Sequence, residues 1–314
     1  MARFILRRLL LLLVTLFVTS MIVFALTQLL PGDVARLILG REAGEQALIN
    51  LRAELGLNDP IPVQYIKWLS GFIVGDWGVA FGPGRPEILP LVAERLGNSL
   101  RLAFFALALS IPLGILLGLA AGLKPGGIID GIVSIFSLSV VGLPEFVTGL
   151  VLINIFAIQL DILPASASTT EANLIEWIRR LLLPAITATL VLLGYIARMT
   201  RAGVIDEMRK PYVRMATLKG LPRRTIIFKH VLRNALLPTI TIIAISFGWL
   251  IGGIVIIESV FSYNGIGRLI IDAVGRKDIP LLQAVVMVVV VFYALASLVA
   301  DLLYAALNPR IRLE

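Results

Sequence analysis

The chain has 314 residues, of which 58% are hydrophobic and 15% are charged, and its formal net charge is +8. Soluble domains carry roughly 45–50% apolar and about 25% charged residues, so this composition excludes an ordinary soluble enzyme, a disordered protein and a fibrous protein. The sequence has no cysteine and a single histidine, His230, which excludes disulfides, thiolate chemistry and a multi-histidine metal site.

Six apolar stretches are long enough to cross a membrane, because a hydrocarbon core of about 30 Å needs about 20 helical residues. The first stretch is longer than the apolar run of a signal peptide and no small-residue cleavage site follows it, so we expect an uncleaved anchor. Only the third stretch contains a charged residue, Glu145. The six stretches are Leu9–Leu30, Leu102–Leu123, Gly131–Leu160, Leu181–Ala197, Ala235–Ile257 and Leu281–Ala300.

Arginine and lysine collect on one side of these spans. They precede the first span at 1–8, fill the loop 198–233 and recur in the tail 308–314. The cytoplasmic loops of membrane proteins carry such an excess, so we expect a multi-pass protein with both termini in the cytoplasm. Basic chains often bind nucleic acid. Here topology accounts for the positive charge, and we expect no nucleic-acid partner.

The spans divide the chain into four segments. Residues 1–30 are the cytoplasmic N-terminus and the first span, and residues 31–98 are an extracytoplasmic insert that mixes Gly, Pro, charge and aromatics. Residues 99–307 are the core of five further spans, with a cytoplasmic loop at 198–234. Residues 308–314 are a cytoplasmic tail. We expect the insert to form a small packed cap.

Motifs of nucleotide and catalytic chemistry are missing from the sequence. It has no GxxxxGK[ST] phosphate loop, no HExxH and no GxSxG. Ionisable residues within the spans, which ion-coupled carriers use in pairs, are scarce. These absences favour a passive or externally powered pathway over a membrane-embedded enzyme. A stand-alone secondary carrier or channel remains the alternative.

The loop between the fourth and fifth spans contains a short predicted helix. Pro211 suits the first turn of a helix, Tyr212–Lys219 would make about two turns, and Gly220 suits the left-handed residue that ends a helix. Pro222 would begin the next helix, toward the membrane. Because two turns are not stable alone in water, neighbours or a partner must hold this helix.

Small and apolar side chains on this helix leave two interpretations open. Ala216 is small enough for another surface to approach closely, and Tyr212 and Val213 offer apolar contact beside it. A partner could therefore dock there. The alternative is a structural elbow between two spans, with basic residues that only set the topology.

This loop resembles the EAA loop of bacterial ABC-importer permeases, and more closely that of the first permease of the peptide/nickel class. The similarity covers nearly the whole chain in order. The loop motif is Tyr212–Leu221 followed by His230–Ala235, and the other matching tracts are Leu29–Asp33, Leu55–Pro60, Gln64–Tyr65, Gly75–Gly78, Leu183–Ala185, Glu258–Phe261, Gly265–Arg268, Asp278–Pro280 and Asp301–Arg312.

The chain departs from the family pattern at a few positions. Arg214 and Met215 stand where the general EAA pattern has Glu and Ala, and Arg233 stands where it has Pro. Glu145 follows Pro144 where an uncharged residue is expected. The first three departures bear on the fine contacts of the loop.

The resemblance implies an all-α polytopic fold of the type I ABC-importer permease, with six transmembrane helices and a small extracytoplasmic insert after the first. A second homologous permease would complete the pore in the bacterial cytoplasmic membrane. Two cytoplasmic P-loop ATPases would bind ATP and Mg, and an extracytoplasmic substrate-binding protein would deliver cargo. The chain itself would have no catalytic residue, cofactor or metal. An ABC exporter core is less consistent, because exporters carry long cytoplasmic helices.

The resemblance also implies that the loop helix would couple to the ATPase and that the binding protein would sit on the segment 31–98 and the outer loops. In the last outer loop, Tyr263, Asn264 and Arg268 would form a dock or an outer gate, and a plain loop is the alternative. Independently of the resemblance, Glu145 is an ionisable residue inside a span, so we expect it and Pro144 to line the pathway; a carboxylate that is hydrogen-bonded or protonated beside a Pro144 kink is the alternative. The coupling residues are Tyr212, Val213, Arg214, Met215, Ala216, Thr217, Leu218, Lys219 and Gly220. The cargo is left open among di- and oligopeptides, glutathione-like peptides, nickel chelates and opine-like conjugates.

Overall fold

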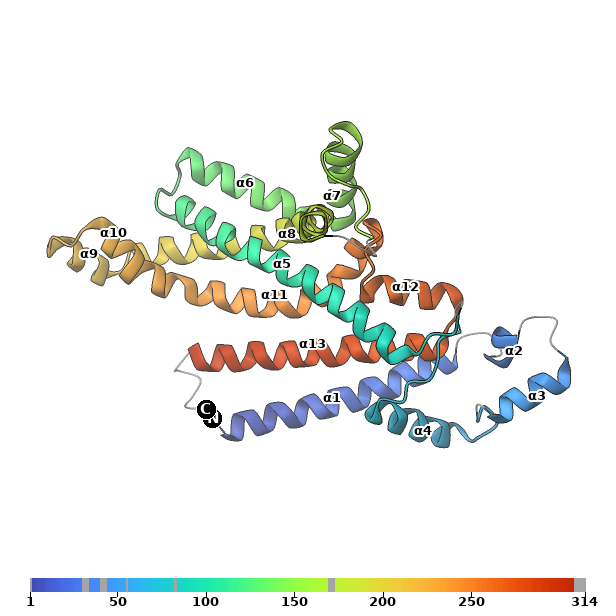
Figure 1. Cartoon of the computed structure of the whole chain (residues 1–314). Helices are drawn as coiled ribbons and strands as arrows, with labels where there is room; N and C mark the ends of the chain where they lie inside the picture. Colours follow the sequence, from blue (N-terminus) through green and yellow to red (C-terminus); the bar gives the residue numbers. More distant parts are fainter. Residues whose placement is uncertain are drawn as a thin grey trace. The chain divides into compact units, whose positions relative to one another are not determined.

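The computed structural model describes residues 2–29, 34–39, 44–54, 56–81, 84–168 and 173–307, and these ranges are mostly helical (Figure 1). The helices in chain order are α1 (Ala2–Gln28), α2 (Val34–Leu39), α3 (Glu45–Glu54), α4 (Ile61–Val74), α5 (Ile88–Gly122), α6 (Ile128–Gly142), α7 (Glu145–Leu152), the π-helix η1 (Ile153–Gln159), α8 (Leu174–Met208), α9 (Pro211–Leu218), α10 (Arg223–Thr225), the π-helix η2 (Ile226–Val231), α11 (Leu232–Val260), α12 (Ile266–Arg276) and α13 (Ile279–Leu307).

Five helices of the described ranges are long and apolar enough to cross a membrane, and a bent pair makes a sixth crossing if it is one span. Their surfaces agree with that assignment. Leu10, Leu13, Val14 and Phe17 of α1 each expose at least half of their surface. A continuous exposed apolar surface of this kind is unfavourable in water and is typical of a helix that faces lipid. The predicted all-α multi-pass fold is confirmed.

The third span is broken rather than continuous. Helices α6 and α7 meet at an angle of 107° across Leu143 and Pro144. Leu143 is extended, with φ −88° and ψ 134°, and Pro144 caps α7. Proline lacks the N–H of the helical ladder and forces the preceding residue out of the helical region. The predicted third span, Gly131–Leu160, is therefore divided between α6 and a second helical segment that begins at Glu145.

Contacts group the chain into two compact units, Met1–Asn98 with Gly265–Ala294, and Ser99–Asn264 with Leu295–Glu314. The predicted division into 1–30, 31–98, 99–307 and 308–314 stays a prediction. Within the first unit, Ile88 and Val92 share an apolar cluster with Leu269 of α12 and Val285 of α13. The segment 265–294 therefore packs with the N-terminal residues. That 31–98 is a separate extracytoplasmic insert stays a prediction.

Buried polar contacts fix the first unit. The Gln283 side chain donates to the hydroxyl of Thr27 at 2.7 Å, which joins α13 to α1. The Asp278 carboxylate accepts from the backbone N–H of Phe81 at 2.6 Å and of Leu281 at 3.2 Å. Asp278 thus caps the start of α13 and holds the loop before α5 against it.

Helix α8 is the centre of the second unit, and small residues let other helices approach it. A Cβ on Gly203 of α8 would lie 2.3 Å from the carbonyl oxygen of Ala235 in α11, and a Cβ on Gly118 of α5 would lie 2.5 Å from the carbonyl oxygen of Ala197. Close backbone approach at small residues is a common packing mode of membrane helices. These glycines therefore set the spacing of α5, α8 and α11.

An ion pair joins the start of α6 to α8. The Arg201 guanidinium binds both carboxylate oxygens of Asp130, and the N–H of Gly126 donates to the same carboxylate at 2.8 Å. Asp130 is buried. A bidentate pair of this kind fixes direction as well as distance, so it orients the turn between α5 and α6.

Candidate coupling helix and transport-pathway residues

A proline and a glycine bound the short helix α9. Pro211 occupies its first turn, as predicted. Gly220 has φ 74°. The N–H of Gly220 donates to the carbonyl oxygen of Thr217 at 3.0 Å, and the N–H of Leu221 donates to that of Ala216 at 3.3 Å. These two bonds form a Schellman motif, which confirms the expected left-handed glycine at the helix end.

The inner face of α9 packs on the chain itself. Val213 and Ala216 are buried in one apolar cluster with Ile226, Ile227 and Val231 of η2. Only 9% of the Ala216 surface is exposed. The small side chain at position 216 therefore fits a neighbour within the same chain. This packing also explains how a helix of eight residues is held in place.

The outer face of α9 is open and partly apolar. Leu218 exposes 74% of its surface and Met215 exposes 55%. Leu221, just after the helix, is exposed as well. The solvent-facing members of the predicted coupling set are Arg214, Met215, Thr217, Leu218, Lys219 and Gly220. Helices α9 and α10 lie together at one end of the long helices α8 and α11 (Figure 1).

Tyr212 joins α9 to its neighbours through its hydroxyl group. The hydroxyl donates to the carboxylate of Glu207 at 2.6 Å and lies 3.4 Å from the carbonyl oxygen of His230. The Asn234 side chain donates to the same hydroxyl at 3.4 Å, and the Lys210 ammonium also binds Glu207. Burial, and then the bond to Glu207, raise the pKa of the Tyr212 phenol, which keeps it protonated as a donor.

Sequence analysis did not identify Glu207 as part of this site. Glu207 and Tyr212 lie on different helices, and the turn at 209–210 between them interrupts the helical period. No spacing rule therefore pairs the two residues. The basic loop 198–233 contains two acidic residues, Asp206 and Glu207, and the sequence pattern does not distinguish between them.

Glu145 lies on the first turn of α7, immediately after the break. Its side chain is half-buried. Within the described ranges no hydrogen bond or ion pair engages its carboxylate. One turn further, the Thr148 hydroxyl is buried and has no hydrogen-bond partner in the part of the chain that is described. Two adjacent polar groups thus keep unused hydrogen-bonding capacity at the bend.

The predicted docking residues of the last outer loop differ in accessibility. Tyr263 exposes only 4% of its surface, and burial raises the pKa of its phenol. Asn264 is half-buried and donates to the hydroxyl of Ser168 at 3.3 Å. Arg268, which belongs to the other compact unit, is half-buried. Tyr263 is therefore a packing residue of its loop, and a docking role stays a prediction for all three.

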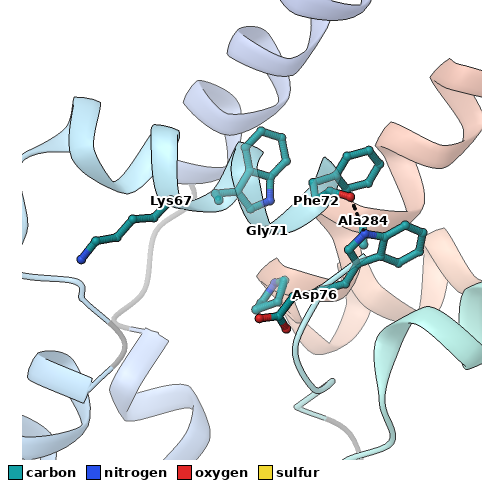
Figure 2. A pocket seen from close by; sticks show the side chains of 8 residues that line it. Lys67, Gly71, Phe72, Asp76 and Ala284 are labelled. Atoms are coloured by element: carbon teal, nitrogen blue, oxygen red, sulfur yellow. Dashed lines mark hydrogen bonds between the residues drawn. The ribbon is translucent and has the colours of Figure 1, made fainter. Parts of the chain in front are cut away.

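Two cavities lie within single units. The first cavity, of about 150 Å³, lies in the first unit and is lined by two tryptophans among other residues. Figure 2 shows that the Lys67 side chain extends away from Asp76 there. Lys67 instead forms an ion pair with Asp59 at 2.7 Å. The other, of about 440 Å³, lies among α6, α8 and α11. Its lining residues are Ser134, Leu138, Tyr195, Arg198, Met199, Arg201, Ala202 and Ile242. None of the predicted site residues lines either cavity.

Among the residues that the structure describes, no group of three or more His, Cys, Asp or Glu side chains is placed to hold a metal ion. The potential ligands are spread over separate contacts, such as Asp130 with Arg201 and Glu207 with Lys210.

The fold is that of the membrane domain of ABC importers. The chain is similar to a solved structure titled "Crystal structure of an amino acid ABC transporter with histidines", with a TM-score of 0.54 and 17% identity over 69% of this chain and 94% of that one. It is equally similar, with a TM-score of 0.54 and 17% identity, to an inward-facing MetNI methionine ABC transporter over 70% of this chain and 98% of that one.

The chain belongs to the family described as binding-protein-dependent transport system inner membrane component, whose model matches residues 110–313, and the model of its N-terminal region matches residues 1–89. It is 37% identical over 99% of its length to the whole of a probable peptide ABC transporter permease protein, y4tP, of Sinorhizobium fredii. It is 35% identical to the glutathione transport system permease protein GsiC of Escherichia coli K12, over 99% of each chain.

The protein is thus a multi-pass permease subunit of the peptide/nickel class of ABC importers. Members of this class form the pore and are not enzymes, and the ATPase is on separate subunits. Membership implies ATPase and binding-protein partners in general, and no cofactor in this chain. The resemblance predicted from the sequence is confirmed.

Proposed function

We propose that this chain forms, with a second homologous permease, the translocation pore for peptides or a related small solute in the bacterial cytoplasmic membrane. The names of its relatives, which concern peptide and glutathione transport, support this cargo class. ATP and Mg would bind to two cytoplasmic P-loop ATPases, and an extracytoplasmic binding protein would deliver the solute. The basic loops 1–8 and 198–233 support cytoplasmic termini.

The outer face of α9 is the proposed ATPase contact. The observation that supports it is an exposed apolar stripe on a helix that is already anchored by its other face. Met215, Leu218 and Leu221 form the stripe, and Arg214 and Lys219 flank it. Exposed apolar side chains with a polar rim are typical of a protein–protein contact. The matching ATPase surface would be an apolar groove with acidic residues at its edge.

Leu218→Glu tests this contact. We expect the variant to lose at least about tenfold in ATPase co-purification from detergent-solubilised membranes, since it places a charge at the centre of an apolar contact. The thermal midpoint of the permease should stay close to that of the unchanged chain, because Leu218 packs little within the chain. The measurement is the ratio of ATPase to permease in the purified complex.

Ile128→Glu is the matched control. Ile128 is 83% exposed, at the first position of α6, and a carboxylate is favourable at a helix N-terminus. It adds the same charge outside α9. Equal loss of ATPase from both variants would contradict a contact centred on α9, and retention of ATPase by Leu218→Glu would contradict the proposed contact.

We propose Pro144 and Glu145 as pathway residues, because the break places the half-buried carboxylate of Glu145 on the first turn of α7, within an apolar span. Ionisable groups inside membrane spans are expensive and are functional candidates for that reason. We expect Glu145→Gln to lower ATP-dependent uptake of peptides with a free amino terminus by about tenfold, with smaller effects on N-acetylated peptides. The measurement is uptake of both peptide types into proteoliposomes, and equal rates in the two proteins would reject the role.

Docking of the binding protein on the last outer loop remains a proposal of the same kind. Asn264 and Arg268 are half-buried and carry polar side chains suited to such a contact, whereas Tyr263 would act by shaping the loop. The support comes from the family relationship, since its members work with binding proteins.

A further inference from the structure

The attachment of α9 to the long helices has a polar part and an apolar part. The apolar part is the cluster that Val213 and Ala216 share with η2, with Val204 of α8 and with Ala235 of α11. Apolar attraction has no direction and is proportional to buried area, so it holds α9 close without fixing its orientation. The polar part is the hydroxyl of Tyr212, whose hydrogen bonds have a required angle and distance.

The acceptor of the Tyr212 hydroxyl is built into the end of α8. Glu207 lies on the last turn of that helix and is buried. Its two carboxylate oxygens are used by different donors, the Tyr212 hydroxyl at 2.6 Å and the Lys210 ammonium. A buried carboxylate with two donors is stabilised in one position, because moving either donor leaves charge without compensation.

The same hydroxyl also reaches the helix that follows α9. It lies 3.4 Å from the carbonyl oxygen of His230 in η2 and 3.4 Å from the side-chain nitrogen of Asn234 in α11. These contacts are longer and weaker than the bond to Glu207. The Tyr212 hydroxyl oxygen thus contacts the last turn of α8 and the first turn of α11, the two long helices that α9 connects in the sequence.

We propose that Tyr212 and Glu207 are the positioning residues that transmit a displacement of α9 to α8 and α11. They act through the orientation of α9 and do not contact the ATPase. Without the Tyr212 hydroxyl, a push on the outer face would turn α9 about the apolar cluster, and less of the displacement would reach the long helices. This inference depends on the proposed ATPase contact, and it predicts a phenotype that loss of that contact cannot produce.

The test is Tyr212→Phe, which removes one oxygen and keeps the ring and its packing. The chain has no cysteine, so a single reporter, Ile242→Cys, can be placed in the cavity among α6, α8 and α11. The complex with its ATPase is reconstituted in lipid nanodiscs. Labelling of the reporter by a polar maleimide is measured with and without ATP and vanadate.

We expect Tyr212→Phe to retain the ATPase while the ATP-dependent change in labelling rate falls by about tenfold, the factor that corresponds to one charged hydrogen bond. Glu207→Ala should behave in the same way, and the double variant should be no worse than either single one. Glu207→Gln keeps an acceptor oxygen for the phenol and should restore most of the change. Tyr293→Phe, at an exposed tyrosine, is the control and should leave the change intact.

The outcomes separate the two proposals. If the ATPase binds Tyr212→Phe and the labelling change is unaltered, the positioning role is wrong while the coupling contact stands. The reporter protein Ile242→Cys, without further substitution, should bind the ATPase and change its labelling rate with ATP. If it binds the ATPase but ATP does not alter its labelling, the displacement does not reach α11 and the inference is also wrong. If no ATPase binds the unchanged permease, the proposed function fails first. Thermal midpoints within about 2 °C of each other show that folding is not the cause.

Discussion

Ala216→Arg is expected to destabilise the packing of α9 by about 3 kcal/mol or more. Ala216 lies in one buried apolar cluster with Ile226, Ile227 and Val231, and 9% of its surface is exposed. A longer side chain overfills this cluster, and a buried guanidinium without an acceptor adds the cost of an unpaired charge. We expect α9 to leave its place, with a lower thermal midpoint in detergent and faster proteolysis of the loop 209–222.

The same substitution is therefore a poor test of ATPase docking when it is used alone. Loss of the ATPase from Ala216→Arg would follow from a displaced helix as much as from a blocked contact. Leu218→Arg is the matched control, because it adds the same group to the exposed face of α9. An unchanged thermal midpoint and an intact loop in Ala216→Arg would show that the described packing of α9 is wrong.

Gly203→Val is expected to have the second large effect, on the packing of α8 against α11. The added Cβ would lie 2.3 Å from the carbonyl oxygen of Ala235, and the contact is backbone that cannot rotate away. Overpacking of this type costs about 1–3 kcal/mol or forces the helices apart. Since α8 and α11 lead to α9, we expect both a lower thermal midpoint and a weaker ATPase association.

Gly131→Val is the control for Gly203→Val. Gly131 also lies in a helix, α6, but a Cβ there meets no atom within 4 Å. Its substitution should change the free energy of unfolding by less than about 0.5 kcal/mol. If the two glycine variants unfold at the same temperature, the close approach of α8 and α11 does not contribute to stability.

Most of the architecture could be predicted from the sequence because membrane spans depend on local composition. The apolar runs are long and nearly free of charge, and the basic loops between them indicate their direction. The two ends of α9 could also be predicted from the sequence, because Pro211 and Gly220 act through their own backbone preferences. The sharp change of direction before Glu145 could not be predicted from the apolar run, because hydropathy does not register direction, although Pro144 marked its place.

For the candidate site, the sequence predicted the position of the helix but not which side chains face a partner. The sequence identified the segment 212–220 through a family resemblance, but it could not assign faces, because a helix of two turns shows too little periodicity to separate them. Tertiary packing turned Val213 and Ala216 inward and left Met215 and Leu218 outside. The pairing of Tyr212 with Glu207 likewise depends on how the chain turns between α8 and α9.

The sequence by itself determined that this protein is a multi-pass membrane permease, because apolar length, charge asymmetry and short motifs are properties of contiguous residues. The tertiary structure decided which side chains of α9 hold the helix and which can meet a partner. It also decided that Asp130 binds Arg201 and that Glu207 binds Tyr212. Those contacts join separate helices, and their geometry comes from packing that no local pattern records.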